Sequence, residues 1–217
     1  MLFRNRREAG QRLAARLVGY KDVPGVIVLA LPRGGVPVGF EVASSLASPL
    51  DVFLVRKIGV PGHSELAMGA IAEGGIEVLH EDLIQDLGIP RHQVQQVVLR
   101  ERIELERRDR LFRGGRPPHR VRGNTVILVD DGLATGSTME AAVAALRDRG
   151  PAQIVVSVPV GARESCERLA RLADSLVCLE MPEPFDAVGR WYQDFDQTSD
   201  AEVVRLLAIA GPPAPEL

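Results

Sequence analysis

The stretch Val126-Ile127-Leu128-Val129-Asp130-Asp131-Gly132-Leu133-Ala134-Thr135-Gly136-Ser137-Thr138-Met139 decides how this chain is interpreted. Its four leading apolar residues predict a buried strand, so the two acids stand at the carboxyl end of that strand, the edge where ligands of open α/β sheets bind. The small and hydroxyl residues 134–138 then open a helix, whose backbone N–H groups and dipole favour a phosphate. A plain turn needs only one acid and one glycine. The segment therefore predicts adjacent sites for an anion and for a polyhydroxylic group.

Strands and helices alternate along most of the chain around this segment. Short apolar runs predict strands, and amphipathic stretches between them predict helices, the first of which is capped by Asn5. The predicted strands are 26–30, 51–55, 125–129, 154–158 and 176–179. They are apolar throughout, which is typical of strands buried on both faces of a parallel sheet. The predicted fold class is therefore α/β, a parallel twisted sheet flanked by helices.

The middle of the chain departs from this alternation. Residues 67–72 and 76–79 are predicted to pair with each other, and residues 56–65 before them are interpreted as a polar loop. A long charged helix with a thin apolar stripe follows at 91–112. We interpret 91–122 as a helical insertion in the α/β fold.

Length and composition favour a single domain that spans 1–217. The 217 residues are 46% hydrophobic and 25% charged, as in an average globular domain. No apolar run approaches the roughly 20 residues of a membrane helix, and the start of the chain lacks a secretory signal, so we expect a cytoplasmic protein with no membrane partner. Cys166 and Cys178 lack the spacing of metal ligands and are interpreted as small buried hydrophobes.

Charge is distributed unevenly along the chain. The net charge is −3, yet residues 91–122 contain ten arginines and four acidic residues. Such an excess of positive charge can mark a site for nucleic acid. Here the arginines alternate with carboxylates at helical spacing, which favours a solvated helix face over a nucleic acid partner.

The central segment resembles the diphosphoribosyl-binding motif of the type I phosphoribosyltransferases, in which four apolar residues precede two acids and a small-residue loop that ends in threonine. The dinucleotide fingerprint GxGxxG and the P-loop GxxxxGK[ST] are both missing from the sequence. The resemblance implies that Asp130 and Asp131 hold the ribose hydroxyls of phosphoribosyl diphosphate, and a Mg²⁺ ion directly or through water. It also implies that the loop binds the 5′-phosphate through Ala134, Thr135, Gly136, Ser137 and Thr138.

Two further segments match elements of the same family. Residues 31–36 resemble its pyrophosphate loop, in which Gly34 and Gly35 let backbone amides approach an anion and Arg33 supplies charge. By resemblance, the peptide between Pro32 and Arg33 is expected to be cis. Arg56 and Lys57 resemble the basic pair that adenine and orotate enzymes place near the pyrophosphate. Lys57, with Asp130 and Asp131, is therefore a candidate catalytic residue, and a solvated strand end is the alternative interpretation of the basic pair.

The loop after this basic pair, 58–67, falls where the family has its mobile catalytic flap. His63 or Glu65 would approach the reacting centre there, and the alternative is that both are plain loop residues.

Residues 181–195 fall where purine-type members carry the hood, the C-terminal segment that stacks the base. Phe185, Trp191 and Tyr192 are therefore candidate base-binding residues, since an aromatic ring can stack on a heterocycle. The alternative is a small satellite core beneath the C-terminal segment. Overall similarity, including the N-terminal stretch 3–10, is greatest to a bacterial group known only as predicted phosphoribosyltransferases.

This resemblance implies a Mg²⁺-dependent transferase in which a nitrogen acceptor, such as a nucleobase, displaces pyrophosphate from phosphoribosyl diphosphate. It also implies a homo-oligomer, with a dimer as the expected assembly. The rival interpretation is a non-catalytic sensor of phosphoribosyl diphosphate or a nucleotide, which binds RNA through 91–122. Turnover separates the two, and the acceptor has no linear signature in the sequence.

Overall fold

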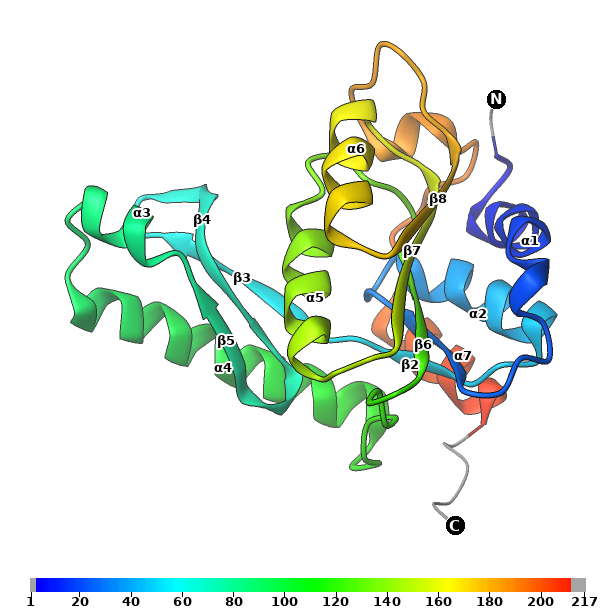
Figure 1. Ribbon diagram of the computed structural model, residues 1–217, viewed down its shortest axis with the longest axis horizontal. Helices are drawn as coiled ribbons and strands as arrows, with labels where there is room; N and C mark the ends of the chain where they lie inside the picture. Colours follow the sequence, from blue (N-terminus) through cyan, green and yellow to red (C-terminus); the bar gives the residue numbers. More distant parts are fainter. Residues whose placement is uncertain (1–2, 212–217) are drawn as a thin grey trace.

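The centre of the molecule is a parallel sheet. The computed structural model describes residues 3–211, except for the side chains of Ser64 and Glu65. Its central strands are β1 (Val26–Ala30), β2 (Leu50–Val52), β6 (Thr125–Val129), β7 (Gln153–Val160) and β8 (Ser175–Glu180). They lie in the order β2-β1-β6-β7-β8, and every neighbouring pair is parallel (Figure 1). The predicted parallel α/β architecture is confirmed.

Helices cover both faces of this sheet. One face carries α1 (Arg6–Arg16), α2 (Gly35–Leu46) and α7 (Asp200–Ala210), and the other carries α5 (Ser137–Asp148) and α6 (Arg163–Leu172) (Figure 1). Short 3₁₀ turns follow α1 at η1 (Val18–Tyr20) and precede α7 at η3 (Val188–Trp191). Alternate residues of β1 face opposite sides, so Val28 packs in the α2 cluster and Ile27 in the α5 cluster. This two-sided burial explains why the strands are apolar throughout.

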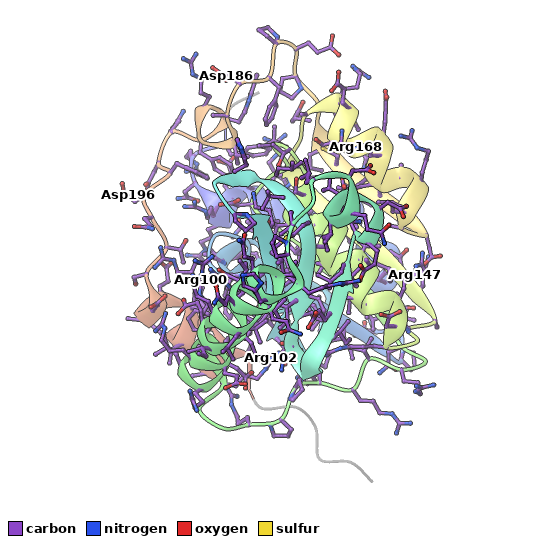
Figure 2. All side chains as sticks on the ribbon, turned by 90° about the vertical axis from the view of Figure 1, so that its left-hand side faces the viewer. Arg100, Arg102, Arg147, Arg168, Asp186 and Asp196 are labelled. Atoms are coloured by element: carbon purple, nitrogen blue, oxygen red, sulfur yellow. The ribbon has the colours of Figure 1, made fainter. Side chains whose placement is uncertain are left out.

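Between β2 and β6 the chain leaves the core and forms an arm, which we define as residues 55–113. The arm contains the strands β3 (Val55–Val60), β4 (His63–Ala72) and β5 (Ile76–Leu79), the turn η2 (Glu73–Gly75), and the helices α3 (Glu81–Asp86) and α4 (Arg91–Arg113). It extends from one side of the core in Figure 1 and faces the viewer in Figure 2, where Arg100 and Arg102 mark α4. The predicted pairing of 67–72 with 76–79 and the predicted long helix are confirmed.

Two sequence predictions in this region are wrong. The strand predicted at 51–55 ends in the core sheet at Val52, and Val55 already begins the antiparallel sheet of the arm. The predicted loop 56–65 is a hairpin, in which β3 and β4 reverse direction between Val60 and His63. Polar side chains on the strands of this thin sheet gave the segment the composition of a loop. Gly62 has a φ of 81°, the left-handed conformation that a glycine adopts readily in such a reversal.

A buried charge network joins the arm to the core. Arg113, at the end of α4, pairs with Asp51 of β2 at 3.1 Å and with Glu73 of η2 at 2.7 Å, and its Nη2 donates to the Val52 carbonyl at 2.6 Å. Arg149 pairs with Glu73 at 3.0 Å from the end of α5. Burial raises the pKa of Glu73 in spite of these two neighbouring arginines. The arm is thus fixed to the core by mutually satisfied charges.

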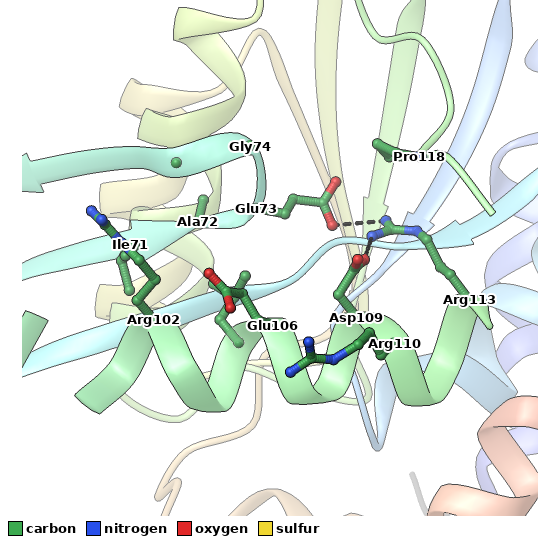
Figure 3. Close-up of a pocket in the computed structure, with 12 residues that line it drawn as sticks. Ile71, Ala72, Glu73, Gly74, Arg102, Glu106, Asp109, Arg110, Arg113 and Pro118 are labelled. Atoms are coloured by element: carbon green, nitrogen blue, oxygen red, sulfur yellow. Dashed lines mark hydrogen bonds and ion pairs between the residues drawn. The ribbon is translucent and has the colours of Figure 1, made fainter. Parts of the chain in front are cut away.

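A pocket of about 690 Å³ lies beside this network, between η2 and α4 (Figure 3). Its wall includes Arg102, Glu106 and Arg110 of α4, and Figure 3 shows Glu73 and Asp109 directed at Arg113. Among the residues that the structure describes, those predicted to bind phosphoribosyl diphosphate do not line it. The pocket therefore belongs to the arm and is separate from the predicted site.

Candidate functional site

The two glycine-containing loops converge at the carboxyl edge of the central sheet. A β-carbon on residue 34 would lie 2.0 Å from Oδ2 of Asp131, and one on residue 35 would lie 2.7 Å from the Val129 carbonyl oxygen. Any side chain at either position would collide with the acidic pair or its backbone. The peptide between Pro32 and Arg33 is cis, as the resemblance implied. Two loops that lie far apart in the sequence therefore form one continuous surface.

The loop at 134–138 is held by its carbonyl groups. Ser165 Oγ of α6 donates to the Ala134 carbonyl at 2.6 Å, and Arg168 Nη2 donates to the Thr135 carbonyl at 2.6 Å. Because C=O and N–H point in opposite directions across a trans peptide, these bonds direct the amides of the next residues away from α6. Gly136, with a φ of 76°, then caps α5 without a side-chain hydrogen bond. The result is a loop at a helix N-terminus in which the amides of Thr135 and Gly136 point away from α6 and the hydroxyls of Thr135 and Ser137 lie 3.2 Å apart. This arrangement suits a phosphate.

The acidic pair is partly buried and electrostatically frustrated. Burial, and next the charge of Asp131, raise the pKa of Asp130 well above its usual range. Burial also raises the pKa of Asp131, although the guanidinium of Arg6 opposes that shift. Arg6 Nε donates to Asp131 Oδ2 at 2.8 Å. The pair thus favours ligands that bring hydroxyl donors or positive charge.

The donor set of the acidic pair fits a Mg²⁺ ion. Carboxylate oxygens are hard ligands, and Mg²⁺ in phosphate sites usually takes one or two protein carboxylates, with water and substrate oxygens completing its shell. Within residues 3–211, side chains of Ser64 and Glu65 excepted, no group of three or more His, Cys, Asp or Glu gathers as a closed metal site. Asp130 and Asp131 would therefore supply the protein ligands of the ion, and water or substrate oxygens would supply the rest.

The predicted basic residues have different environments. Arg33 pairs with Asp200 of α7 at 3.4 Å, beside the glycine loop. Arg56 Nε donates to Glu101 Oε2 of α4 at 2.7 Å, so its guanidinium is engaged within the arm. Lys57 follows it on β3, is half-buried, and lies on the opposite face of the strand by the alternation of side chains. The role of Arg56 and Lys57 at the pyrophosphate stays a prediction.

The residues of the predicted flap, 58–67, lie in the β3–β4 hairpin and form its tip. His63 lies exposed at the start of β4. The side chain of Glu65 lies outside the described residues. A catalytic role for either residue stays a prediction.

The hood packs as a small core and also covers the acidic pair. Tyr192 is buried between the rings of Phe3 and Phe195, at centroid distances of 5.4 and 4.9 Å, and its hydroxyl donates to the Asp131 carbonyl at 2.6 Å. This packing agrees with the alternative of a small satellite core, and the base-binding role of Tyr192 stays a prediction. Phe185 and Trp191 are only partly buried against this core, and their base-binding role stays a prediction.

Sequence reasoning missed two residues of the site. Arg6 lies in the N-terminal stretch that supported the resemblance, but its contact with Asp131 spans 125 positions and has no linear signal. Asp200 opens α7, a helix that was not predicted. Its signal was present, because Ser199 caps the helix by accepting from the Glu202 backbone N–H, the pattern of a capping box.

Comparison with known proteins agrees with this geometry. A family profile described as phosphoribosyl transferase domain matches residues 3–190. The chain is 47% identical, over 206 residues, to the Mycobacterium tuberculosis H37Rv protein named "Putative phosphoribosyl transferase Rv0571c"; the match covers 95% of this chain and 46% of that protein. The solved structure of TT1426 from Thermus thermophilus superposes with a TM-score of 0.85 at 42% identity, covering 95% of this chain and 98% of that one.

A shorter match covers part of the chain. "Bifunctional protein PyrR" of Brevibacillus brevis is 35% identical over 86 residues, which cover 38% of this chain and 48% of that protein. The chain spans about half the length of the curated relatives it matches. In the described part of the chain, no helix has the length and apolar character needed to cross a membrane. By its profile match and its similarity to these relatives, the chain belongs to the phosphoribosyl transferase family.

Proposed function

We propose that this protein is a Mg²⁺-dependent phosphoribosyltransferase, which uses phosphoribosyl diphosphate as donor and a nitrogen compound, such as a nucleobase, as acceptor. The observation that carries the proposal is the contact of the Arg33-Gly34-Gly35 loop with Asp131, next to the phosphate loop that opens α5. One edge of the sheet thus offers places for pyrophosphate, for two ribose hydroxyls and for a terminal phosphate, in the order in which the donor carries them.

In this reaction the main task of the protein is to position the ribose ring and the phosphate groups of the donor. Asp130 and Asp131 accept hydrogen bonds from the ribose hydroxyls and fix the ring, while the amides around Gly136 hold the 5′-phosphate at the other end. Mg²⁺, when bound, neutralises negative charge on the pyrophosphate. The Gly35 backbone N–H donates to the Leu31 carbonyl at 3.1 Å, so the backbone amide of Gly34 is the one that would meet the charge that develops on the leaving group as its bond to the anomeric carbon breaks.

The acceptor approaches from the side of the hood. Val188 lies against Gly132, since a β-carbon on residue 132 would lie 2.5 Å from Val188 Cγ1. The hood therefore closes over the turn that follows the acidic pair, next to the place proposed for the anomeric carbon. Its partly buried aromatic residues, Phe185 and Trp191, are the ones available to contact an acceptor ring.

The proposal is tested by measuring pyrophosphate release from phosphoribosyl diphosphate and Mg²⁺ with a panel of purines, pyrimidines and other nitrogen compounds. We expect release that depends on one class of acceptor. Asp130→Asn/Asp131→Asn serves as the inactive control. Tight donor binding without release for any acceptor would favour the sensor, and no donor binding at all would overturn the proposal.

A further inference from the structure

The guanidinium of Arg6 lies inside the donor site, although its residue belongs to the first turn of α1. Its Nε donates to Asp131 Oδ2 at 2.8 Å, and its Nη1 donates to the Asp196 carbonyl at 2.7 Å. The guanidinium carbon also lies 3.9 Å from the centroid of the Phe195 ring, a cation–π arrangement. With 12% of its side chain exposed, Arg6 is held from three sides.

The oxygen that Arg6 holds is the one that the pyrophosphate loop approaches. A β-carbon on residue 34 would come closest to Oδ2 of Asp131, the same atom that accepts from Arg6. Gly34 thus packs against this oxygen while Arg6 donates to it, so a metal ion or a ribose hydroxyl that takes Oδ2 has to compete with the guanidinium for it. Two positive charges at one carboxylate oxygen repel each other strongly in a partly buried site.

We propose that the guanidinium of Arg6 occupies the cation position of the donor site when no ligand is bound. A divalent ion replaces this guanidinium at Asp131 when the donor binds. This inference rests on the proposed function, because it takes the acidic pair as the place of the donor's metal ion. In the absence of ligand, Arg6 stabilises the Asp131 carboxylate. When the divalent ion binds, the hydrogen bond from Arg6 to Asp131 Oδ2 is broken. It acts through Asp131 and is thus a positioning residue.

The exchange has a consequence for the N-terminal segment. When Arg6 leaves Asp131, its bonds to the Asp196 carbonyl and the Phe195 ring are disturbed together. The same segment is joined to the hood by backbone bonds, from Phe3 N–H to the Trp191 carbonyl and from Gln193 N–H to the Phe3 carbonyl, both at 2.8 Å. Donor binding is therefore transmitted to the hood through the start of α1.

Arg7 provides a matched control for Arg6. It lies next to Arg6 on the same helix, and its side chain is 75% exposed and pairs with Glu41 at 3.0 Å on the surface. Arg6→Met and Arg7→Met remove the same charge and keep a similar stem. Arg6→Lys keeps a positive charge, but its compact ammonium lacks the fork that bonds two groups at once.

The first measurement is titration of the full chain with Mn²⁺ alone, a hard divalent ion that accepts the same carboxylate ligands, followed by the paramagnetic resonance of free Mn²⁺. We expect Arg6→Met to bind Mn²⁺ at about tenfold lower concentration, since the competing charge-assisted hydrogen bond is gone. Arg7→Met should match the unchanged protein, and Arg6→Lys should lie between. Equal Mn²⁺ binding by Arg6→Met and the unchanged protein would overturn the inference.

The second measurement uses the single tryptophan of the chain, Trp191, as a reporter of the hood. Titration with phosphoribosyl diphosphate and Mg²⁺ should change its fluorescence in the unchanged protein and in Arg7→Met, with a smaller change in Arg6→Met. Loss of Mg²⁺–donor affinity in Arg6→Met, without any gain for Mn²⁺, would show that Arg6 binds the donor directly and would overturn the exchange. If calorimetry finds no donor binding to the unchanged protein, the proposed function fails, while the Mn²⁺ comparison still tests Arg6.

Discussion

The carboxyl edge of the core and the base of the arm both depend on charged residues, but they use charge differently. At the base of the arm, Arg113 has 2% of its side chain exposed and is surrounded by Asp51, Glu73 and Asp109. At the carboxyl edge, Arg33 and Asp200 remain 33% and 40% exposed, and the acidic pair is held by Arg6 at one carboxylate oxygen. The first network is closed, and the second is open toward ligands.

This difference separates stability from binding. A closed network that loses one member leaves buried charges without partners, which costs folding free energy. We expect an open one, built on glycine loops and helix ends, to be completed by a ligand, so that its residues affect binding more than folding. The following experiments test that separation, beginning with the largest expected effect.

Replacing both acids, Asp130→Asn/Asp131→Asn, should abolish most donor binding while the protein stays folded. Each substitution removes a charged acceptor worth about 1.5 to 3 kcal/mol, so calorimetry should show affinity for phosphoribosyl diphosphate lower by about 10²- to 10⁴-fold. Stability should change little, because burial raises the pKa of both acids and thus disfavours their charged forms in the folded state. Unchanged donor affinity in the folded variant would refute the role of the pair.

Arg113→Met should give the opposite result, a loss of stability with the carboxyl edge intact. Breaking a buried ion pair typically costs about 3 to 5 kcal/mol, because the partner carboxylates are left uncompensated. Denaturant unfolding would measure this loss, with Arg107→Met as the control, since Arg107 is 53% exposed on the same helix. A destabilisation as small as that of Arg107→Met would break the distinction between closed and open networks.

Lys57 lies where the arm begins, and its substitution tests whether the arm contributes to chemistry. If its ammonium meets the pyrophosphate as charge develops, Lys57→Ala should lower turnover by about 10²- to 10³-fold and donor affinity much less. Lys57→Arg should restore binding better than rate, because a planar fork replaces a compact ammonium. Steady-state pyrophosphate release and donor titration measure the two effects. Equal losses in both would assign Lys57 to ground-state binding.

The core and its proposed phosphate loop were predictable from the sequence because both depend on residues that are close together in the chain. Strands buried on both faces are continuous apolar runs, and a phosphate loop needs small residues next to a strand end, so both leave a local signal at 125–138. The β3–β4 hairpin leaves a weaker one. Arg56 and Lys57 are polar residues inside a strand of a thin sheet, and their pattern resembles a loop until the partner strand is known.

Contacts between segments that are distant in the chain could not be predicted from the sequence. The position of Arg6 beside Asp131 depends on how α1 packs across the sheet, and that of Arg113 beside Asp51 depends on where α4 ends relative to β2. Tyr192 shows the same limit, since its ring suited an acceptor in the sequence but fills a core in the structure. Residue types suggest the chemistry of the candidate site, while packing decides which of its groups remain exposed.

The smallest expected effect comes from the outer surface of the arm. Hydrogen bonds from Arg107, at 2.7 Å, and from Arg108, at 2.9 Å, lower the pKa of Glu104 to about 2. A carboxyl group whose pKa is lower in the folded state adds stability above its unfolded pKa, near 4.5, and loses that contribution as the pH falls toward 2. Because Arg107 is exposed and Glu104 and Arg108 are only partly buried, solvent screens their interaction, and the gain should be only about 0.5 kcal/mol.

Glu104→Gln should therefore lower the free energy of unfolding by about 0.5 kcal/mol at neutral pH, with Glu106→Gln on the same helix as the control. Other carboxyl groups titrate in the same range, so the informative quantity is the difference between the variant and the unchanged protein at each pH. Denaturant unfolding should show that difference shrinking below about pH 4.5 and in high salt. A difference of several kcal/mol that resists salt would mean that charges on the surface of the arm stabilise it as Arg113 does, and the division between closed and open networks would then no longer follow burial.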